Sequence, residues 1–268
     1  MRQNTFVQLA FNSKYITDFT YNSGASPMFL YAGNAGGNAT FYNYVKEANR
    51  QAKNLGNALV RLKPVASAAD HTTDIIDALD VKPVVMGHST GGLLAQMLAG
   101  RGLSAATVAI DPGVFRGVLP LPGSVLKGVG PFLLNPLTRG RAITLTYDQF
   151  KYGWANALDE KEAKQLYDTF HVAGSGISLV QMGNANLNPW TEAKVDTKNP
   201  DRGPLLIIDG EKDHTVPWAI ANAAYKRQRR NPGVTEIVKI PNRGHALTID
   251  HGWREVAQTA LDFVKRFA

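Results

Sequence analysis

The chain has 268 residues, of which 44% are hydrophobic and 19% are charged, and it contains no cysteine. This balance is typical of a globular protein with a sizeable core, and it excludes an extended disordered chain. The lack of cysteine excludes disulfides, thiol catalysis and cysteine-ligated zinc or iron–sulfur centres.

The formal net charge is +7, and the densest basic run extends from Lys226 to Arg230. We expect this run to form the solvated face of a late helix, because no aromatic residues alternate with it and no nucleic-acid-binding motif surrounds it. The N-terminus lacks the apolar region of a signal peptide, and no segment approaches about 18 uninterrupted apolar residues. We therefore expect a cytoplasmic protein that binds neither nucleic acid nor membrane, while the sequence leaves its oligomeric state open.

The first third of the chain alternates short apolar runs with helical patterns. Residues 5–10 and 14–21 predict a β-hairpin, and residues 27–31 predict a short strand that ends in a glycine-rich loop at 32–38. The next elements are a helix over 40–54, a strand over 57–62, and a helix that starts at Asp70 or Thr72 and ends at Leu79.

The stretch from Pro83 to Gly100 joins an apolar run to a helical pattern through Gly87-His88-Ser89-Thr90-Gly91. In a G-x-S-x-G turn between strand and helix, the serine occupies a sharp, strained bend, and the flanking glycines let strand and helix pass closely. The bend exposes the serine hydroxyl, and the N–H groups at the start of the helix face the place where an oxyanion would develop. We interpret the turn as a nucleophile elbow with Ser89 as the nucleophile.

Ser104 to Ile110 predicts another buried strand, which ends at Asp111. Residues 113–200 then lose the alternation, since they contain many prolines and glycines, helical patterns over 147–157 and 159–170, and no convincing buried strand. The alternation returns with a strand at 204–209, a helix at 217–229, a strand at 235–240 and an amphipathic helix at 253–267. Strands alternating with helices predict an α/β fold, with a mostly parallel sheet covered on both faces and ligands at the carboxyl ends of the strands.

Two of these strand ends carry a carboxylate and a histidine that can activate a serine. The strand at 204–209 leads to Asp213, and the strand at 235–240 leads to His245. A serine hydroxyl needs an imidazole to take its proton and a carboxylate to fix the tautomer of that imidazole. Ser89, Asp213 and His245 supply the three groups, in the chain order of the α/β-hydrolase fold.

Other residues compete for these roles. Asp111 is the rival acid, because it also ends a strand. We expect His214 to orient the acid loop and His251 to start a helix, and we find no carboxylate-bearing strand end for the remaining histidines, His71, His88 and His171. No H-E-x-x-H motif and no cluster of histidines and carboxylates at ligand spacing is present in the sequence, so we expect no metal.

The elbow GHSTGG, the acid loop GEKDHTVP and the base loop NRGH make the whole chain resemble the α/β-hydrolase family of serine esterases. The elbow is also similar to that of cofactor-free haloperoxidases and perhydrolases. One position differs, because the family usually has His-Gly at the end of the third strand and this chain has Ala32-Gly33. The family's oxyanion hole is made of backbone N–H groups, so we expect those of Thr90 and Asn34 to form it here.

The resemblance also implies a cap over the active site. The core then comprises residues 1–112 and 201–268, and residues 113–200 form an inserted, mainly helical cap. Aromatic residues of this segment, Phe150, Trp154 and Trp190 among them, either line a lipophilic pocket or form the small core of the cap itself.

The sequence thus predicts a cofactor-free hydrolase that cleaves a small-to-medium lipophilic carboxylic ester through an acyl-enzyme. Two alternatives stay open. The same triad can transfer the acyl group to peroxide, and a hydrolase fold can bind a ligand without turning it over, for which the missing His-Gly is the support.

Overall fold

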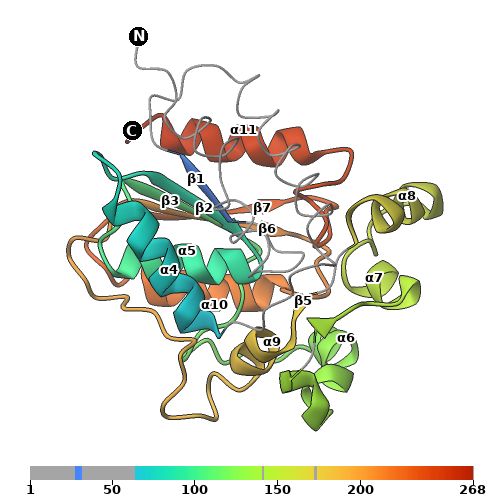
Figure 1. Cartoon of the computed structure of the whole chain (residues 1–268). Helices are drawn as coiled ribbons and strands as arrows, with labels where there is room; N and C mark the ends of the chain where they lie inside the picture. The colour runs from blue at the N-terminus through green and yellow to red at the C-terminus, as the bar shows by residue number, and fades with distance from the viewer. Residues whose placement is uncertain (1–27, 32–63, 141, 172–173, 268) are drawn as a thin grey trace.

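The computed structural model describes residues 28–31, 64–140, 142–171 and 174–267, and Figure 1 shows their arrangement. The predicted hairpin, the glycine-rich loop, the helix at 40–54 and the strand at 57–62 lie outside the described residues.

The described strands form a central sheet of the order β1-β2-β3-β6-β7. In this sheet β2 (Val84–His88), β3 (Ala106–Ile110), β6 (Leu205–Gly210) and β7 (Thr235–Ile240) are parallel neighbours. The short strand β1 (Met28–Tyr31) pairs antiparallel with β2. The predicted parallel sheet is confirmed, and its carboxyl ends bring the segments that follow β2, β3, β6 and β7 to one edge.

Helices cover both faces of the sheet, as the alternation predicted. Figure 1 shows α4 (Val65–Asp77), α5 (Thr90–Gly100) and α10 (Trp218–Gln228) on one face and α11 (Trp253–Val264) on the other. Every position of β2, β3 and β6 is buried, and successive side chains alternate between the two faces. Val85, Ala109 and Ile207 pack toward α4, α5 and α10, while Met86, Val108 and Ile208 pack toward α11.

The helix before the elbow starts earlier than the sequence predicted. It begins at Val65, directly after Pro64, so Asp70 and Thr72 lie inside it and cap nothing. Proline fixes φ near the value that a helix start needs, and Val65, Ala68, Ala69, Thr72 and Ile76 form a buried stripe from the first turn onward. The Thr72 hydroxyl donates to the carbonyl of Ala68, which satisfies it within the helix.

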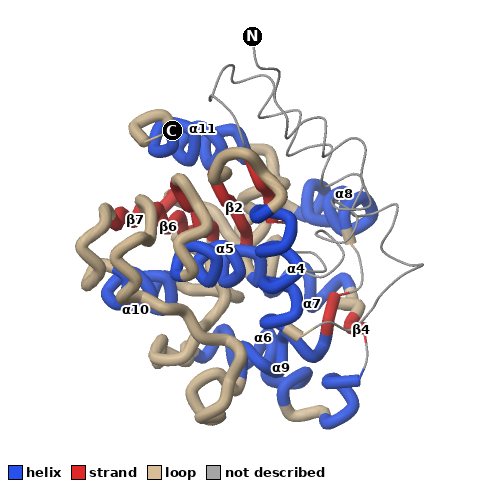
Figure 2. Tube along the Cα trace, turned by 60° about the vertical axis from the view of Figure 1, so that its left-hand side comes forward, coloured by secondary structure: helices blue, strands red, loops and turns tan. Residues whose placement is uncertain are grey.

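The inserted segment, residues 113–200, lies between β3 and β6 and holds more helices than the sequence predicted. Its elements are α6 (Gly123–Leu133), the 3₁₀ helix η1 (Pro136–Gly140), β4 (Ala142–Ile143), α7 (Tyr147–Gly153), α8 (Glu160–Phe170), β5 (Gly174–Ser175) and α9 (Gly176–Gly183). Only α7 and α8 were predicted. Figure 2 shows these helices gathered along one side of the molecule, away from β6 and β7. Within the described residues, no helix has the length and apolar character needed to cross a membrane.

Candidate active site

Ser89 occupies a strained bend between β2 and α5. Its φ is 54° and its ψ is −117°, a left-handed conformation that costs energy in a residue with a side chain. The turn requires glycine beside it, because a Cβ on Gly87 would lie 2.0 Å from the carbonyl oxygen of Gly91. Ser89 stands at the N-cap position of α5, yet its side chain makes no capping hydrogen bond. The hydroxyl is therefore available for chemistry.

The acid and base loops meet at the carboxyl edge of the sheet. His245 Nδ1 lies 2.6 Å from Asp213 Oδ2, and both side chains are buried. The other carboxylate oxygen, Asp213 Oδ1, accepts the backbone N–H groups of Thr215 at 2.6 Å and Val216 at 2.9 Å. Both oxygens of Asp213 are thus held, and a carboxylate at Nδ1 fixes the imidazole tautomer that leaves Nε2 free to accept a proton.

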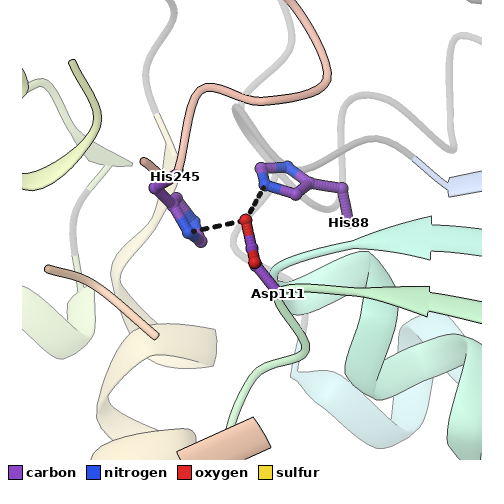
Figure 3. A group of neighbouring side chains, drawn as sticks. All are labelled: His88, Asp111 and His245. Carbon is purple, nitrogen blue, oxygen red and sulfur yellow. Dashed lines mark ion pairs between the residues drawn. The ribbon is translucent and has the colours of Figure 1, made fainter. Parts of the chain in front are cut away.

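His88 and Asp111 lie against His245, as Figure 3 shows. Asp111 Oδ2 is 3.7 Å from His245 Nδ1 and 3.7 Å from His88 Nε2, beyond hydrogen-bond distance in both cases. Asp111 Oδ1 accepts the N–H of Gly210 at 2.8 Å, which joins the ends of β3 and β6. Asp213, and not Asp111, is therefore the carboxylate within hydrogen-bond distance of His245.

The expectation that His88 has no carboxylate-bearing strand end nearby is wrong. His88 pairs with Ile110 in the parallel register of β2 and β3, so the two strand ends bring His88 to Asp111. The sequence also showed no cluster of histidines and carboxylates, whereas ligand atoms of His88, Asp111 and His245 lie within 4.8 Å of one another, close enough to hold an ion. An ion there would compete with Asp213 for His245 Nδ1.

Burial controls the charges of this cluster. It raises the pKa of Asp111 well above its usual value, and the neighbouring carboxylates of Asp213 and Asp209 raise it further. Burial likewise raises the pKa of Asp209 to about 9, with the Asp213 carboxylate adding to the effect and Lys239 opposing it. Burial and the adjacent His245 lower the pKa of His88. Asp111, Asp209 and His88 are therefore biased toward their neutral forms, since a cluster of buried charges without cations is unfavourable.

Residues of the inserted segment form hydrogen bonds with the two loops that carry Asp213 and His245, and these bonds hold the loops in place. Asn156 Nδ2 donates to the Lys212 carbonyl at 2.7 Å, and the N–H of Ala246 donates to the Trp154 carbonyl at 3.0 Å. His214 Nδ1 lies 3.0 Å from the Tyr152 carbonyl oxygen, which agrees with the predicted role of His214 in orienting the acid loop. Beyond the base loop, His251 Nδ1 lies 2.7 Å from Glu162 Oε2 of α8.

A cavity of about 410 Å³ opens beside Ser89, Thr90 and His245. Its walls are mainly apolar and come from α6, α7 and α9, among them Val129, Phe132, Phe150, Trp154, Leu179 and Met182. The Trp154 ring stands edge-on to the ring of His245, with 4.6 Å between centroids. Cavities of this size and composition commonly hold small organic ligands.

The predicted pocket residues divide into those that line this cavity and one that does not. Phe150 and Trp154 line it, whereas Trp190 is 86% exposed and is not part of the lining. Trp190 follows Pro189 in a loop beyond α9, and aromatic content alone could not indicate which way that loop faces. The non-aromatic apolar residues that α6 and α9 add to the lining were missed, because the prolines and glycines around them resemble loop sequence.

The predicted oxyanion hole is only partly within the described residues. Thr90 lies at the first position of α5 and lines the cavity, and the first N–H groups of a helix have no acceptor within that helix. Asn34 lies outside the described residues.

Comparisons with known proteins agree with this architecture. A family model described as "Alpha/beta hydrolase family" matches residues 54–259. No curated protein matches the sequence closely. Among solved structures, the monoacylglycerol lipase of Paleococcus ferrophilus is 18% identical, with a TM-score of 0.55 and coverage of 77% of each chain.

Two further solved structures have similar scores. A thermophilic esterase of Thermogutta terrifontis is 15% identical, with a TM-score of 0.53 over 77% of this chain and 74% of that one. A meta-cleavage product hydrolase of Pseudomonas fluorescens is 17% identical, with a TM-score of 0.53 over 78% of this chain and 75% of that one. At such identities the likeness establishes the fold. The family match, which extends over most of the sequence, shows that the chain belongs to the alpha/beta hydrolase family.

Proposed function

We propose that this hydrolase cleaves small-to-medium lipophilic carboxylic esters through an acyl-enzyme formed on Ser89. The observation that carries the proposal is the pairing of His245 Nδ1 with Asp213 Oδ2 at 2.6 Å beside the cavity that Ser89 also lines. His245 Nε2 is buried and has no hydrogen-bond partner among the described residues. An unpartnered basic nitrogen next to a strained serine is the arrangement that proton abstraction needs.

The chemistry follows from these atoms. Nε2 of His245 takes the Ser89 proton as the hydroxyl oxygen attacks the ester carbonyl, and Asp213 stabilises the imidazolium that forms. The Thr90 N–H stabilises the oxyanion of the tetrahedral intermediate. The imidazolium then protonates the leaving alkoxide, and water, activated by the same imidazole, releases the acid from Ser89. Ser89 does not hydrogen-bond to His245 Nε2 in the described structure, and catalytic hydrogen bonds often tighten only when substrate binds.

The apolar cavity supports an ester with a hydrocarbon portion. Valine, leucine, phenylalanine and tryptophan side chains from the inserted segment surround the space next to Ser89. A hydrocarbon chain gains about 0.8 kcal/mol for each methylene that it buries, so kcat/KM should rise with chain length until the cavity is full.

The test is a series of p-nitrophenyl esters of increasing chain length, assayed with the parent and with Ser89→Ala. We expect a maximum of kcat/KM within the series and a loss on the order of 10⁶ in kcat for the variant. Thermal unfolding provides the control, because removal of one hydroxyl should leave the melting temperature nearly unchanged. A Ser89→Ala protein that retained a tenth of the parent activity would eliminate Ser89 as the nucleophile.

A further inference from the structure

Most of the large hydrophobic side chains that the described structure exposes belong to the inserted segment. They are Leu119, Leu121, Leu126, Leu134, Leu137, Leu187 and Trp190, and only Val81 and Val234 lie elsewhere in the described chain. Single exposed leucines are ordinary, but a concentration of them on one segment marks a surface that contacts something apolar.

Three of these leucines stand at the mouth of the cavity. Leu119, Leu121 and Leu187 line it, although they are 72%, 59% and 80% exposed to solvent. Their two loops are held together, because Asn186 accepts the N–H of Gly117 at 2.6 Å and donates to the carbonyl of Val118 at 2.7 Å. The apolar lining therefore continues outward as a fixed rim, here called the leucine rim.

The chain on either side of the rim leucines is mainly basic, and the nearest carboxylate after it, Glu192, accepts a hydrogen bond from Gln181 of α9. Residues 113–147 contain Arg116, Lys127, Arg139 and Arg141 but no aspartate or glutamate, and residues 171–191 contain neither acidic residues nor lysine or arginine. The carboxylates of the inserted segment begin at Asp148 and are frequent in α8, which Figure 1 shows well apart from α6 and α9. The described basic residues of this stretch, Arg116, Lys127 and Arg139, are exposed and belong to the same segment of the chain as the leucine rim.

In place of the expectation from the sequence that the protein binds no membrane, we propose that the leucine rim docks on the surface of an anionic lipid bilayer, with leucine side chains inserted at the level of the head groups and the basic residues facing lipid phosphates. Apolar side chains flanked by lysine and arginine are what such an interface binds. A second copy of the chain is the poorer occupant, because a symmetric contact would place the basic residues of the two copies face to face.

Docking would open the apolar cavity directly toward the hydrocarbon of the bilayer. A lipophilic ester could then pass from membrane to cavity without crossing water, and the leucines would be covered. This passage rests on the proposed esterase function, whereas the docking itself does not.

The test measures co-sedimentation of Ser89→Ala protein with vesicles, so that turnover has no influence on binding. One vesicle preparation is phosphatidylcholine alone and the other is phosphatidylcholine mixed with phosphatidylglycerol. We expect binding to the mixed vesicles that weakens as salt is added. In the same background, Leu119→Ser with Leu187→Ser should weaken the partition about a hundredfold, because each leucine taken out of the interface accounts for about a factor of ten.

The matched control is Val81→Ser with Val234→Ser, which removes two exposed apolar side chains away from the leucine rim and should leave the partition unchanged. Circular dichroism melting checks that all variants fold. The proposal is overturned if the parent does not co-sediment with anionic vesicles, or if the rim and control variants lose binding equally. Sedimentation velocity would also overturn it if the parent were a dimer, the rim variant a monomer and the control variant still a dimer. A second copy of the chain would then be the occupant. Loss of ester hydrolysis in the parent would refute the proposed function and leave the vesicle result standing.

Discussion

Replacement of Asp213 by asparagine tests whether Asp213 or Asp111 is the acid that supports His245. The structure determines which way the new side-chain amide is oriented. Asp213 Oδ1 accepts N–H groups from Thr215 and Val216, so an asparagine has to place its carbonyl oxygen there. Its NH₂ group then faces His245 Nδ1 across the 2.6 Å contact. Nδ1 is forced to accept a hydrogen bond, its proton moves to Nε2, and the imidazole can no longer take the proton of Ser89.

The expected loss for Asp213→Asn is on the order of 10⁴ in kcat, which corresponds to about 5 kcal/mol of transition-state stabilisation. Asp111→Asn should cost far less, because Asp111 has no hydrogen bond to His245 and an amide oxygen can still accept the N–H of Gly210. Both variants are compared by kcat on one p-nitrophenyl ester, with thermal melting as the folding control. If Asp111→Asn were the more damaging change, the acid would be Asp111 and the account of the site would fail.

Two further predictions concern stability. Gly87→Ala should destabilise the fold by about 3 kcal/mol in urea unfolding, because the new Cβ would meet backbone at 2.0 Å, whereas Gly123→Ala, with open space around it, should stay within about 0.5 kcal/mol. Asp209, with a pKa of about 9, keeps its proton in the folded protein up to a much higher pH than in the unfolded chain, which releases it near pH 4. The Asp209 carboxyl should therefore lower the free energy of unfolding as pH rises between these values, by at most about 1.4 kcal/mol per pH unit, and Asp209→Asn should make the measured slope shallower; an unchanged slope would refute the assignment.

The sheet and its site-bearing loops were predictable because local patterns determine them. The mainly apolar runs of β2, β3 and β6 are buried at every position, and such sequences are compatible with few structures other than an interior strand. The position of Ser89 follows from flanking glycines that only a close strand–helix passage requires. Asp213 could be named as a candidate because it follows β6, and His245 because it follows the partly buried strand β7.

The inserted segment was less predictable, since tertiary contacts decide it. In α6, Pro131 lies inside the helix and Gly128 and Gly130 weaken its propensity, yet the helix forms in the structure, where it packs against α7 and α9. The direction of Trp190 and the approach of His88 to Asp111 depend likewise on which elements become neighbours. No local pattern contains that information.

The central claim, that Ser89 is an activated nucleophile, is tested most directly with a fluorophosphonate. Its phosphorus bonds to a serine only when a base has activated the hydroxyl, and its oxygen occupies the oxyanion position. Peptide mass spectrometry should find one phosphonate per chain, attached to Ser89, and little or none on His245→Ala protein under the same conditions. A folded parent protein that stays unlabelled while it reversibly binds a lipophilic ester would contradict the claim and favour a hydrolase fold that binds without catalysis.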